Sequence, residues 1–175
     1  MPSRARANTA YILTYTNRRF YPLDANQCDV CITDIAHALA YSCRFNGHVS
    51  QFYSVAQHSV LASYLCVEDP RWALMHDAAE AYLPDIARPI KQHINGFDAI
   101  ELRLLRVIAA AFSLSPPPYS ESVSRVDDRL LATEMRDLMH GPVDISFEPF
   151  SWRIVPWSPE VSEREFLERY SYLFG

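Results

Sequence analysis

The sequence predicts a mostly α-helical protein with a single domain and a small antiparallel strand pair at one edge. Apolar residues recur at intervals of three and four along most of the chain, which is the pattern of helices with one buried face. Residues that favour helix starts and stops punctuate this pattern. The 175 residues, of which 49% are apolar, suffice for one buried core and leave little room for a second.

The strand pair is expected to involve the N-terminal region. Residues 11–21 are rich in Tyr, Thr and Ile, which is typical of a short strand, and the chain would turn at Asn17. Residues 142–159 have no regular pattern, but residues 152–155 could form a strand within them. That strand could pair with residues 11–15.

Six helices are expected in the rest of the chain. Ser54 can cap the second helix, and Asp69 followed by Pro70 favours the start of the third. Asn46-Gly47 and Pro84 are stop signals. The expected ranges are 33–45, 54–66, 70–83, 97–112, 120–139 and 158–174, with residues 85–95 broken by Pro89.

Composition narrows the functional classes. The net charge of −5 argues against a protein that coats nucleic acid, because such a protein needs a dominant positive field. No apolar run approaches the ~20 residues that span a bilayer, and the first 13 residues do not resemble a signal peptide. Four cysteines in a chain of this length do not make a disulfide framework. We therefore expect a cytoplasmic protein.

One short segment concentrates ionisable groups. His76, Asp77 and Glu80 fall within five residues of an otherwise apolar stretch, and a continuous helix would place them in neighbouring rows. Burying three such groups without a partner is costly, and a divalent cation is a natural partner. Imidazole and carboxylate ligands suit zinc, manganese, iron, cobalt or nickel. The same pattern also fits a partly exposed helix face with an ordinary acid pair.

Two further segments carry isolated polar groups on expected helices. His58 lies among small and apolar neighbours, where a lone histidine is more often a hydrogen-bonded core residue than a metal ligand. Asp127 and Asp128 directly precede an apolar run, which also fits solvated acids that interact with the helix dipole. Each signal is weak alone, and only the combination is informative.

The combination resembles the HD superfamily of metal-dependent phosphohydrolases, whose pattern is H…HD…D. The resemblance covers residues 32–139. It is greatest to bacterial 5′-deoxynucleotidases and to phage deoxynucleotide triphosphohydrolases, including enzymes that remove dATP. Residues 76–91, HDAAEAYLPDIARPIK, match the family segment HD-x-x-E-x4-D…P-x-K with each spacing intact. The resemblance implies that residues 1–175 form a single HD-domain helical bundle.

The resemblance also implies roles for individual residues. The implied metal ligands are His58, His76, Asp77 and Asp128. Asp128 is preferred to Asp127 because the family's acid stands two residues before a leucine, as Asp128 does before Leu130. The implied catalytic residues are Glu80 and, in support, Asp85. The implied substrate-binding residues are Arg44, Phe45, Lys91 and Arg125, where Arg44-Phe45 resembles a family Arg-Trp pair.

The implied function is hydrolysis of 2′-deoxynucleotides in nucleotide-pool metabolism. The substrate would be a deoxynucleoside triphosphate, as for a dATPase, or a deoxynucleoside 5′-monophosphate. We expect one divalent transition metal per chain, with Mg²⁺ as a possible companion of the phosphates. The expected partners are this small-molecule substrate and further copies of the chain in a homo-oligomer, with no nucleic-acid polymer and no membrane.

The alternative is a catalytically inactive HD module that binds a nucleotide and acts as a regulator. Loss of a ligand or of Glu80 would favour it, and this sequence has lost neither. Cys28 and Cys31 have the spacing of half a zinc site, but no second pair follows at the distance of a zinc finger. We therefore expect no structural zinc at these cysteines.

Overall fold

The structure is a computed structural model, and it describes residues 10–84, 86–140 and 146–175. Within these ranges it is mostly helical with one small antiparallel sheet, which confirms the predicted class. The α-helices described are α1 (Ile32–Tyr41), α2 (Val55–Leu65), α3 (Pro70–Met75), α4 (Arg88–Lys91), α5 (Phe97–Ala111), α6 (Glu121–Leu138) and α7 (Pro159–Phe174). Shorter 3₁₀ turns are η1 (Pro22–Asp24), η2 (Gln27–Asp29), η3 (Arg44–Gly47) and η4 (Ala78–Ala81).

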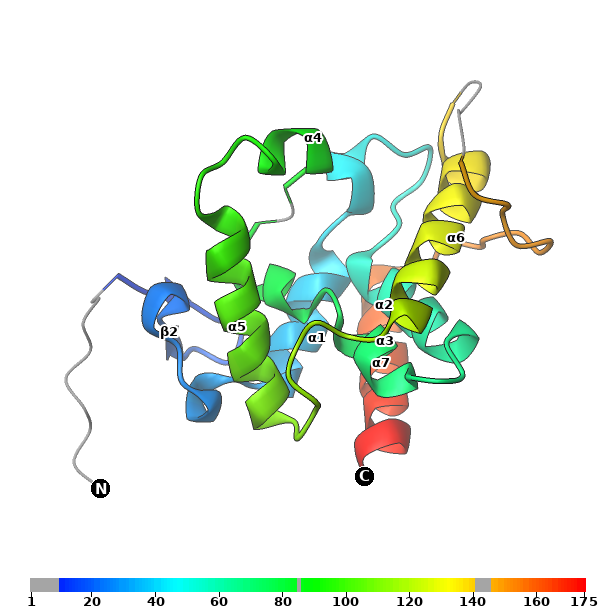
Figure 1. Cartoon of the computed structure of the whole chain (residues 1–175). Helices are drawn as coiled ribbons and strands as arrows, with labels where there is room; N and C mark the ends of the chain where they lie inside the picture. Colours follow the sequence, from blue (N-terminus) through cyan, green and yellow to red (C-terminus); the bar gives the residue numbers. More distant parts are fainter. Residues whose placement is uncertain (1–9, 85, 141–145) are drawn as a thin grey trace, which may run out of the picture.

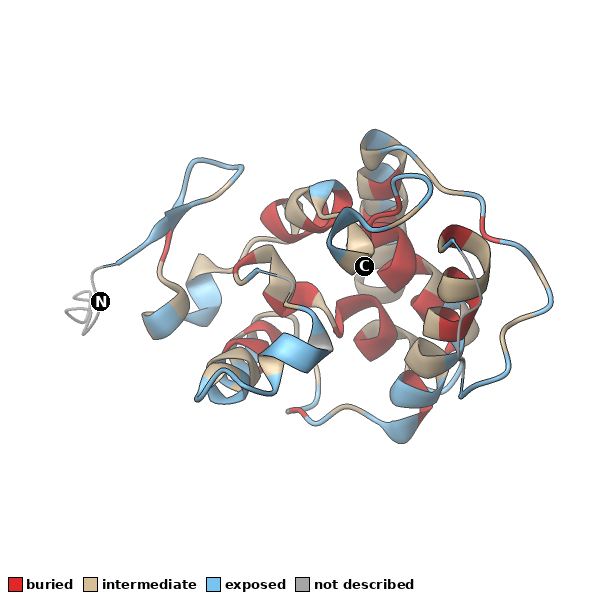
Figure 2. Cartoon of the chain, turned by 90° about the horizontal axis from the view of Figure 1, so that it is seen from above, coloured by how far each residue is buried: buried red, intermediate tan, exposed pale blue. Residues whose placement is uncertain are grey.

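Helix α2 is the centre of the arrangement. It packs against α1, α3, α6 and α7, while the hairpin and α5 lie toward one side and α6 toward the other (Figure 1). Most residues of α2 are buried, which explains why its apolar side chains follow no single stripe. Figure 2 shows the buried residues gathered where the helices face one another. Polar side chains on α2 must therefore find their partners inside the protein.

Side-chain caps begin several helices where the sequence predicts them. Ser54 Oγ accepts a hydrogen bond from the backbone N–H of Gln57 at 3.0 Å, at the start of α2. Asp69 and Ser158 cap α3 and α7 in the same way, each with a proline in the first turn. In the described part of the chain, no helix is long and apolar enough to cross a membrane.

The strand pair forms, but with a different partner from the one predicted. Strand β1 (Ile12–Leu13) pairs antiparallel with β2 (Arg19–Phe20), with Ile12 opposite Phe20. Asn17, in the connecting turn, has a φ of 61°, so the predicted turn is confirmed. The predicted strand over residues 152–155 does not form and does not pair with residues 11–15.

The ends of α2 and α6 explain why residues 150–155 form no strand. Arg136 on α6 donates to the backbone carbonyls of Phe150 and Trp152, both at 2.6 Å. Gln57 on α2 donates to the carbonyl of Val155 at 2.8 Å. Because side chains of the helical core satisfy these backbone groups, the segment needs no neighbouring strand.

The helix predicted over residues 70–83 is interrupted. Helix α3 ends at Met75 and η4 begins at Ala78, so the residues of the HD pair lie between two helical pieces. The carbonyl of Ala73, which would accept from the N–H of Asp77 in a continuous α-helix, accepts from Nδ1 of His76 at 2.8 Å. The expectation that His76 and Glu80 lie one turn apart on a regular helix is therefore wrong.

A buried carboxylate near the end of α6 provides a test of this packing. Asp137 accepts hydrogen bonds from Arg136, from Arg153 and from the backbone N–H of Ile154. Burial opposes its ionisation, but these three donors outweigh burial and lower the pKa of Asp137 to about 2. Since this value lies below the unfolded value of about 3.9, the stabilisation is complete above about pH 5 and is lost as the pH falls through about 2.

We therefore expect Asp137→Asn to lower the free energy of unfolding by about 1–2 kcal/mol at pH 7, because an amide cannot accept from all three donors. Urea unfolding of both proteins between about pH 7 and pH 2 measures this difference. It should shrink as the pH falls from about 4 to about 2. A difference that stays constant over the whole range would contradict the assignment.

Candidate metal centre

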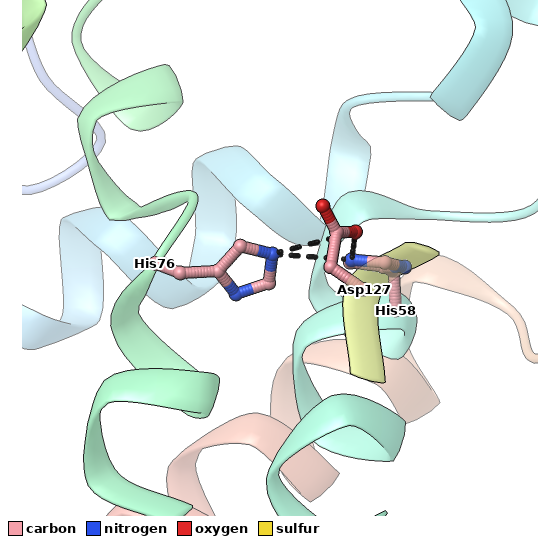
Figure 3. Close-up of side chains that lie close together, drawn as sticks. All are labelled: His58, His76 and Asp127. Carbon is pink, nitrogen blue, oxygen red and sulfur yellow. Dashed lines mark hydrogen bonds and ion pairs between the residues drawn. The ribbon is translucent and has the colours of Figure 1, made fainter. Parts of the chain in front are cut away.

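Three side chains from three helical segments converge inside the bundle. His58 comes from α2, His76 follows the last residue of α3, and Asp127 comes from α6 (Figure 3). The two Nε2 atoms are 3.2 Å apart, and Oδ1 of Asp127 lies 3.1 Å from Nε2 of His58 and 3.9 Å from Nε2 of His76. Both histidines are buried and Asp127 is half-buried. These three residues could hold a metal ion.

Each imidazole is fixed by an acceptor at its other nitrogen. Nδ1 of His76 contacts the carbonyl oxygen of Ala73, and Nδ1 of His58 contacts Oε1 of Glu134 at 2.6 Å. A carbonyl and an ionised carboxylate can only accept, so both Nδ1 atoms carry the proton and donate. In the neutral form of each imidazole, the Nε2 lone pair then faces the centre of the group, which is the arrangement found in histidines that bind metals.

Asp77 adds a second carboxylate to the group. Its Oδ2 lies 3.3 Å from Nε2 of His76 and 3.8 Å from Nε2 of His58. The group whose ligand atoms all lie close together consists of His58, His76 and Asp127, and Asp77 lies at its edge, near both histidines. Nitrogens that bind one zinc ion at ~2.0–2.1 Å, with angles of about 90–110°, are about 3.0–3.4 Å apart, and the observed 3.2 Å agrees with this.

The structure brings Asp127, and not the predicted Asp128, to the two histidines. Along α6, buried Val123, Leu130 and Glu134 lie four residues before, three after and seven after Asp127, and so share its helix face. Asp128 is rotated by about 100° from that face. The leucine spacing that favoured Asp128 was therefore the wrong criterion, and helical periodicity would have selected Asp127.

Charge balance also favours a divalent cation. Asp77, Asp127 and Glu134 carry three negative charges, and Arg44 is the cation in contact with two of them. Its Nη2 lies 2.9 Å from Oε2 of Glu134 and its Nη1 lies 3.5 Å from Oδ2 of Asp77. With neutral imidazoles the group keeps two unbalanced negative charges, which is the charge that a divalent cation neutralises.

The pKa shifts within the group follow from these contacts. Burial and Arg44 oppose a charge on His58, but Glu134 and Asp127 outweigh them and raise the pKa of His58 to about 9. Burial opposes ionisation of Glu134, yet Arg44 and His58 lower its pKa to about 2. Burial also opposes ionisation of Asp127, but the hydrogen bond and the charge of His58 outweigh burial and lower the pKa of Asp127 well below its ordinary value. A proton on His58 therefore competes with a cation for the same site.

Two predicted substrate residues, Arg44 and Phe45, belong to η3 next to the group. The guanidinium carbon of Arg44 lies 5.6 Å from the centre of the Phe45 ring. Phe45, Asn46 and Gly47 all have positive φ, a left-handed conformation that costs energy at non-glycine residues. This turn leaves the phenylalanine ring beside the guanidinium that reaches Asp77.

The other predicted residues are placed as follows. Glu80 is half-buried on η4, and its backbone N–H donates to the carbonyl of Asp77 at 2.9 Å. Asp85 lies outside the described residues. Lys91 donates to Glu101, and exposed Arg125 pairs with Glu68 and Glu121, about 200° around α6 from Asp127. The roles of Lys91 and Arg125 at phosphate stay predictions.

Sequence reasoning missed Glu134, which lies in the middle of this network. The available signal was its position seven residues after Asp127, two turns along the same buried face of an otherwise polar helix. The four cysteines are free, and the metal group found among the described residues contains none of them.

Sequence comparison finds relatives that cover three quarters of the chain or more. No protein-family model matches. The uncharacterized protein YfdR of Escherichia coli (strain K12) is 39% identical over 173 residues, which cover 94% of this chain and 96% of YfdR. The uncharacterized protein RCAP_rcc00048 of Rhodobacter capsulatus is 35% identical over 149 residues, which cover 75% of this chain and 76% of that protein.

Neighbouring aspartates on α6 allow a matched test of the metal group. We expect the purified protein to bind about one divalent transition metal per chain. Asp127→Ala should weaken binding at least about 100-fold because a ligand is lost, whereas Asp128→Ala should change it by less than about threefold. Isothermal titration calorimetry with Zn²⁺ or Co²⁺ measures both. The opposite ranking of the two variants would restore Asp128 as the ligand.

Proposed function

This chain belongs to the family that includes YfdR and RCAP_rcc00048, and we propose that it is a metal-dependent phosphohydrolase of 2′-deoxynucleotides with an HD-type helical bundle. The observation that carries the proposal is the convergence of His58, His76 and Asp127, with Asp77 between His76 and the guanidinium of Arg44. A cation site next to a fixed positive charge suits a phosphate group, which needs neutralisation on several oxygens.

The metal would be held by the Nε2 atoms of His58 and His76 and by carboxylate oxygens of Asp127 and Asp77. These donors suit zinc, manganese, iron, cobalt or nickel. When bound, such a cation lowers the pKa of a nearby water and polarises a phosphate oxygen. The protein's part is to hold a proton on Nδ1 of each imidazole, through Ala73 and Glu134, so that Nε2 is the atom left for the metal, and to exclude bulk water by burying them.

Arg44 would bind a phosphate oxygen and stabilise the negative charge that develops there. Its side chain is 15% exposed, and two carboxylates fix the orientation of its guanidinium. Burial opposes its charge, but Glu134 and Asp77 outweigh burial and raise the pKa of Arg44 above its ordinary value. It therefore stays a cation at every pH at which the protein is folded.

Glu80 would move the proton. It stands three residues after Asp77, on the turn whose first hydrogen bond joins its N–H to the Asp77 carbonyl. Glu80 thus follows His76 and Asp77 closely in the chain, on a 3₁₀ turn in place of a continuous helix. A carboxylate in this position can accept a proton from the attacking water or relay one to the leaving group.

One experiment separates this function from the alternative of an inactive nucleotide-binding regulator. Purified protein is incubated with each deoxynucleoside mono- and triphosphate and with each ribonucleotide, in the presence of Mn²⁺, Co²⁺, Zn²⁺ or Mg²⁺, and products are identified by chromatography. We expect release of phosphate or of triphosphate from deoxynucleotides. Saturable nucleotide binding without any product would favour the regulator. A deoxynucleotide pool as substrate also agrees with a cytoplasmic protein.

The catalytic carboxylate is tested by Glu80→Gln. We expect this variant to keep the fold and the metal but to lose hydrolysis by roughly 100-fold or more, which is the usual effect of removing an acid–base group. Initial rates and metal content are measured on the same preparation. Glu165→Gln is a control, because Glu165 is also half-buried and pairs with Arg164 on α7, which has no proposed role at the site. Normal turnover by Glu80→Gln would assign proton transfer to another group, with Asp85 next.

Substrate choice is tested at Phe45. If its ring packs against the deoxyribose, a 2′-hydroxyl would be desolvated without a hydrogen bond, at a cost of about 1–3 kcal/mol. We therefore expect kcat/KM for dATP to exceed that for ATP by roughly 5- to 150-fold. Phe45→Ala should reduce this ratio, whereas Phe147→Ala, at an exposed phenylalanine after α6, should not. Equal rates of the wild-type protein on ATP and dATP would exclude this role of Phe45.

A further inference from the structure

Glu134 is a fully buried carboxylate whose two oxygens serve different parts of the proposed active site. Oε1 accepts from Nδ1 of His58 at 2.6 Å. Oε2 accepts a hydrogen bond from Nε of Arg44 at 3.0 Å and lies 2.9 Å from Nη2 of the same guanidinium in an ion pair. One side chain of α6 thus contacts a proposed metal ligand on α2 and the proposed phosphate-binding residue on η3.

The contact with His58 determines which nitrogen faces the metal group. A neutral imidazole has one N–H and one lone pair, and the acceptor at Nδ1 keeps the proton there. If the proton moved to Nε2, it would point at His76 and Asp127 and block cation binding. The carboxylate also makes the imidazole more basic, which strengthens it as a ligand.

The contact with Arg44 determines where its remaining donors point. Two of its nitrogens are used by one carboxylate oxygen, and this leaves Nη1 toward Asp77 at 3.5 Å. Without Glu134, the guanidinium could rotate onto Asp77 and form its main ion pair with a proposed metal ligand. Arg44 would then compete with the cation for Asp77.

We propose that Glu134 is a positioning residue that orients His58 toward the metal and holds Arg44 beside it. The inference rests on the proposed function for the role of Arg44 at phosphate, but its metal-binding half depends only on the cluster of His58, His76 and Asp127. Glu134 itself does not belong to that cluster.

Glutamine at position 134 cannot replace the carboxylate, although it has nearly the same shape. Both Arg44 and His58 present donors, and an amide offers one acceptor oxygen and one donor NH₂. If the oxygen faces Arg44, the NH₂ faces Nδ1 of His58 and favours the wrong tautomer. If the oxygen faces His58, the NH₂ meets the guanidinium. Either orientation disturbs one of the two groups.

The test measures Co²⁺ binding by wild type, Glu134→Gln, Glu134→Asp and Asp137→Asn, through the visible absorption of bound Co²⁺ and by calorimetry. Asp137→Asn is the matched control, because Asp137 is another buried acid on α6 that accepts from arginines. We expect Glu134→Gln to bind Co²⁺ about 10- to 100-fold more weakly and with an altered spectrum at saturation, and the control to bind within about threefold of wild type. Orthophosphate should then bind roughly tenfold more weakly to the Co²⁺-loaded Glu134→Gln protein.

The outcomes are distinguishable. Equal losses in Glu134→Gln and Asp137→Asn would reduce Glu134 to a general packing role, and wild-type affinity in Glu134→Gln would overturn the inference. If circular dichroism shows that Glu134→Gln does not fold, the Co²⁺ affinity of Glu134→Asp takes its place. This variant keeps the charge but is one methylene too short to reach both partners, so it too should bind Co²⁺ more weakly than wild type. A wild-type protein that binds Co²⁺ with these differences but hydrolyses no deoxynucleotide would refute the proposed function alone. A wild-type protein that binds no Co²⁺ would refute both.

Discussion

Uncompensated negative charge inside the bundle is the constraint on which the rest of the structure depends. Three carboxylates and one guanidinium surround two buried imidazoles where α2, α3 and α6 meet. Removing one partner from a buried charged pair costs about 3–5 kcal/mol, so each of these groups fixes the positions of its neighbours. The interruption between α3 and η4 places His76 and Asp77 in this group. The burial of α2 on most sides removes the water that would otherwise weaken the interactions.

Much of the fold could be predicted from local signals. Caps at Ser54, Asp69 and Ser158 lie where the sequence places them, because a cap is a contact between residues two or three apart. One of the two errors in the fold arises from contacts over longer distances, and the other from a local competition for a backbone carbonyl. The predicted strand over residues 152–155 does not form, because side chains of α2 and α6 bind its backbone carbonyls at sequence separations of 98 and 16, respectively. The predicted helix over residues 70–83 is broken where His76 competes for a backbone carbonyl.

The candidate site divides in the same way. His58, His76 and Asp77 could be selected from a spacing pattern, and the structure brings them together. Selecting Asp127 instead of Asp128 requires knowing which face of α6 is buried. The pair itself leaves this open, and only the buried face formed by Val123, Leu130 and Glu134 settles it. Glu134 could not be found from a motif, since its partners are 76 and 90 residues away and a buried glutamate is rare without them.

The proposed cation site and the proposed nucleoside contacts are located in different parts of this molecule. The groups that would bind a cation come from α2, α3 and α6, which are packed against one another and cannot move independently. The groups that would contact the nucleoside come from η3, a short turn with three consecutive left-handed residues. Among the contacts described, Arg44 is the one residue of η3 that connects this turn to the buried carboxylates. Substitutions in η3 at positions other than Arg44 can therefore change the ligand without disturbing the cation site. Substitutions at Glu134 act on both parts, since this one side chain joins them.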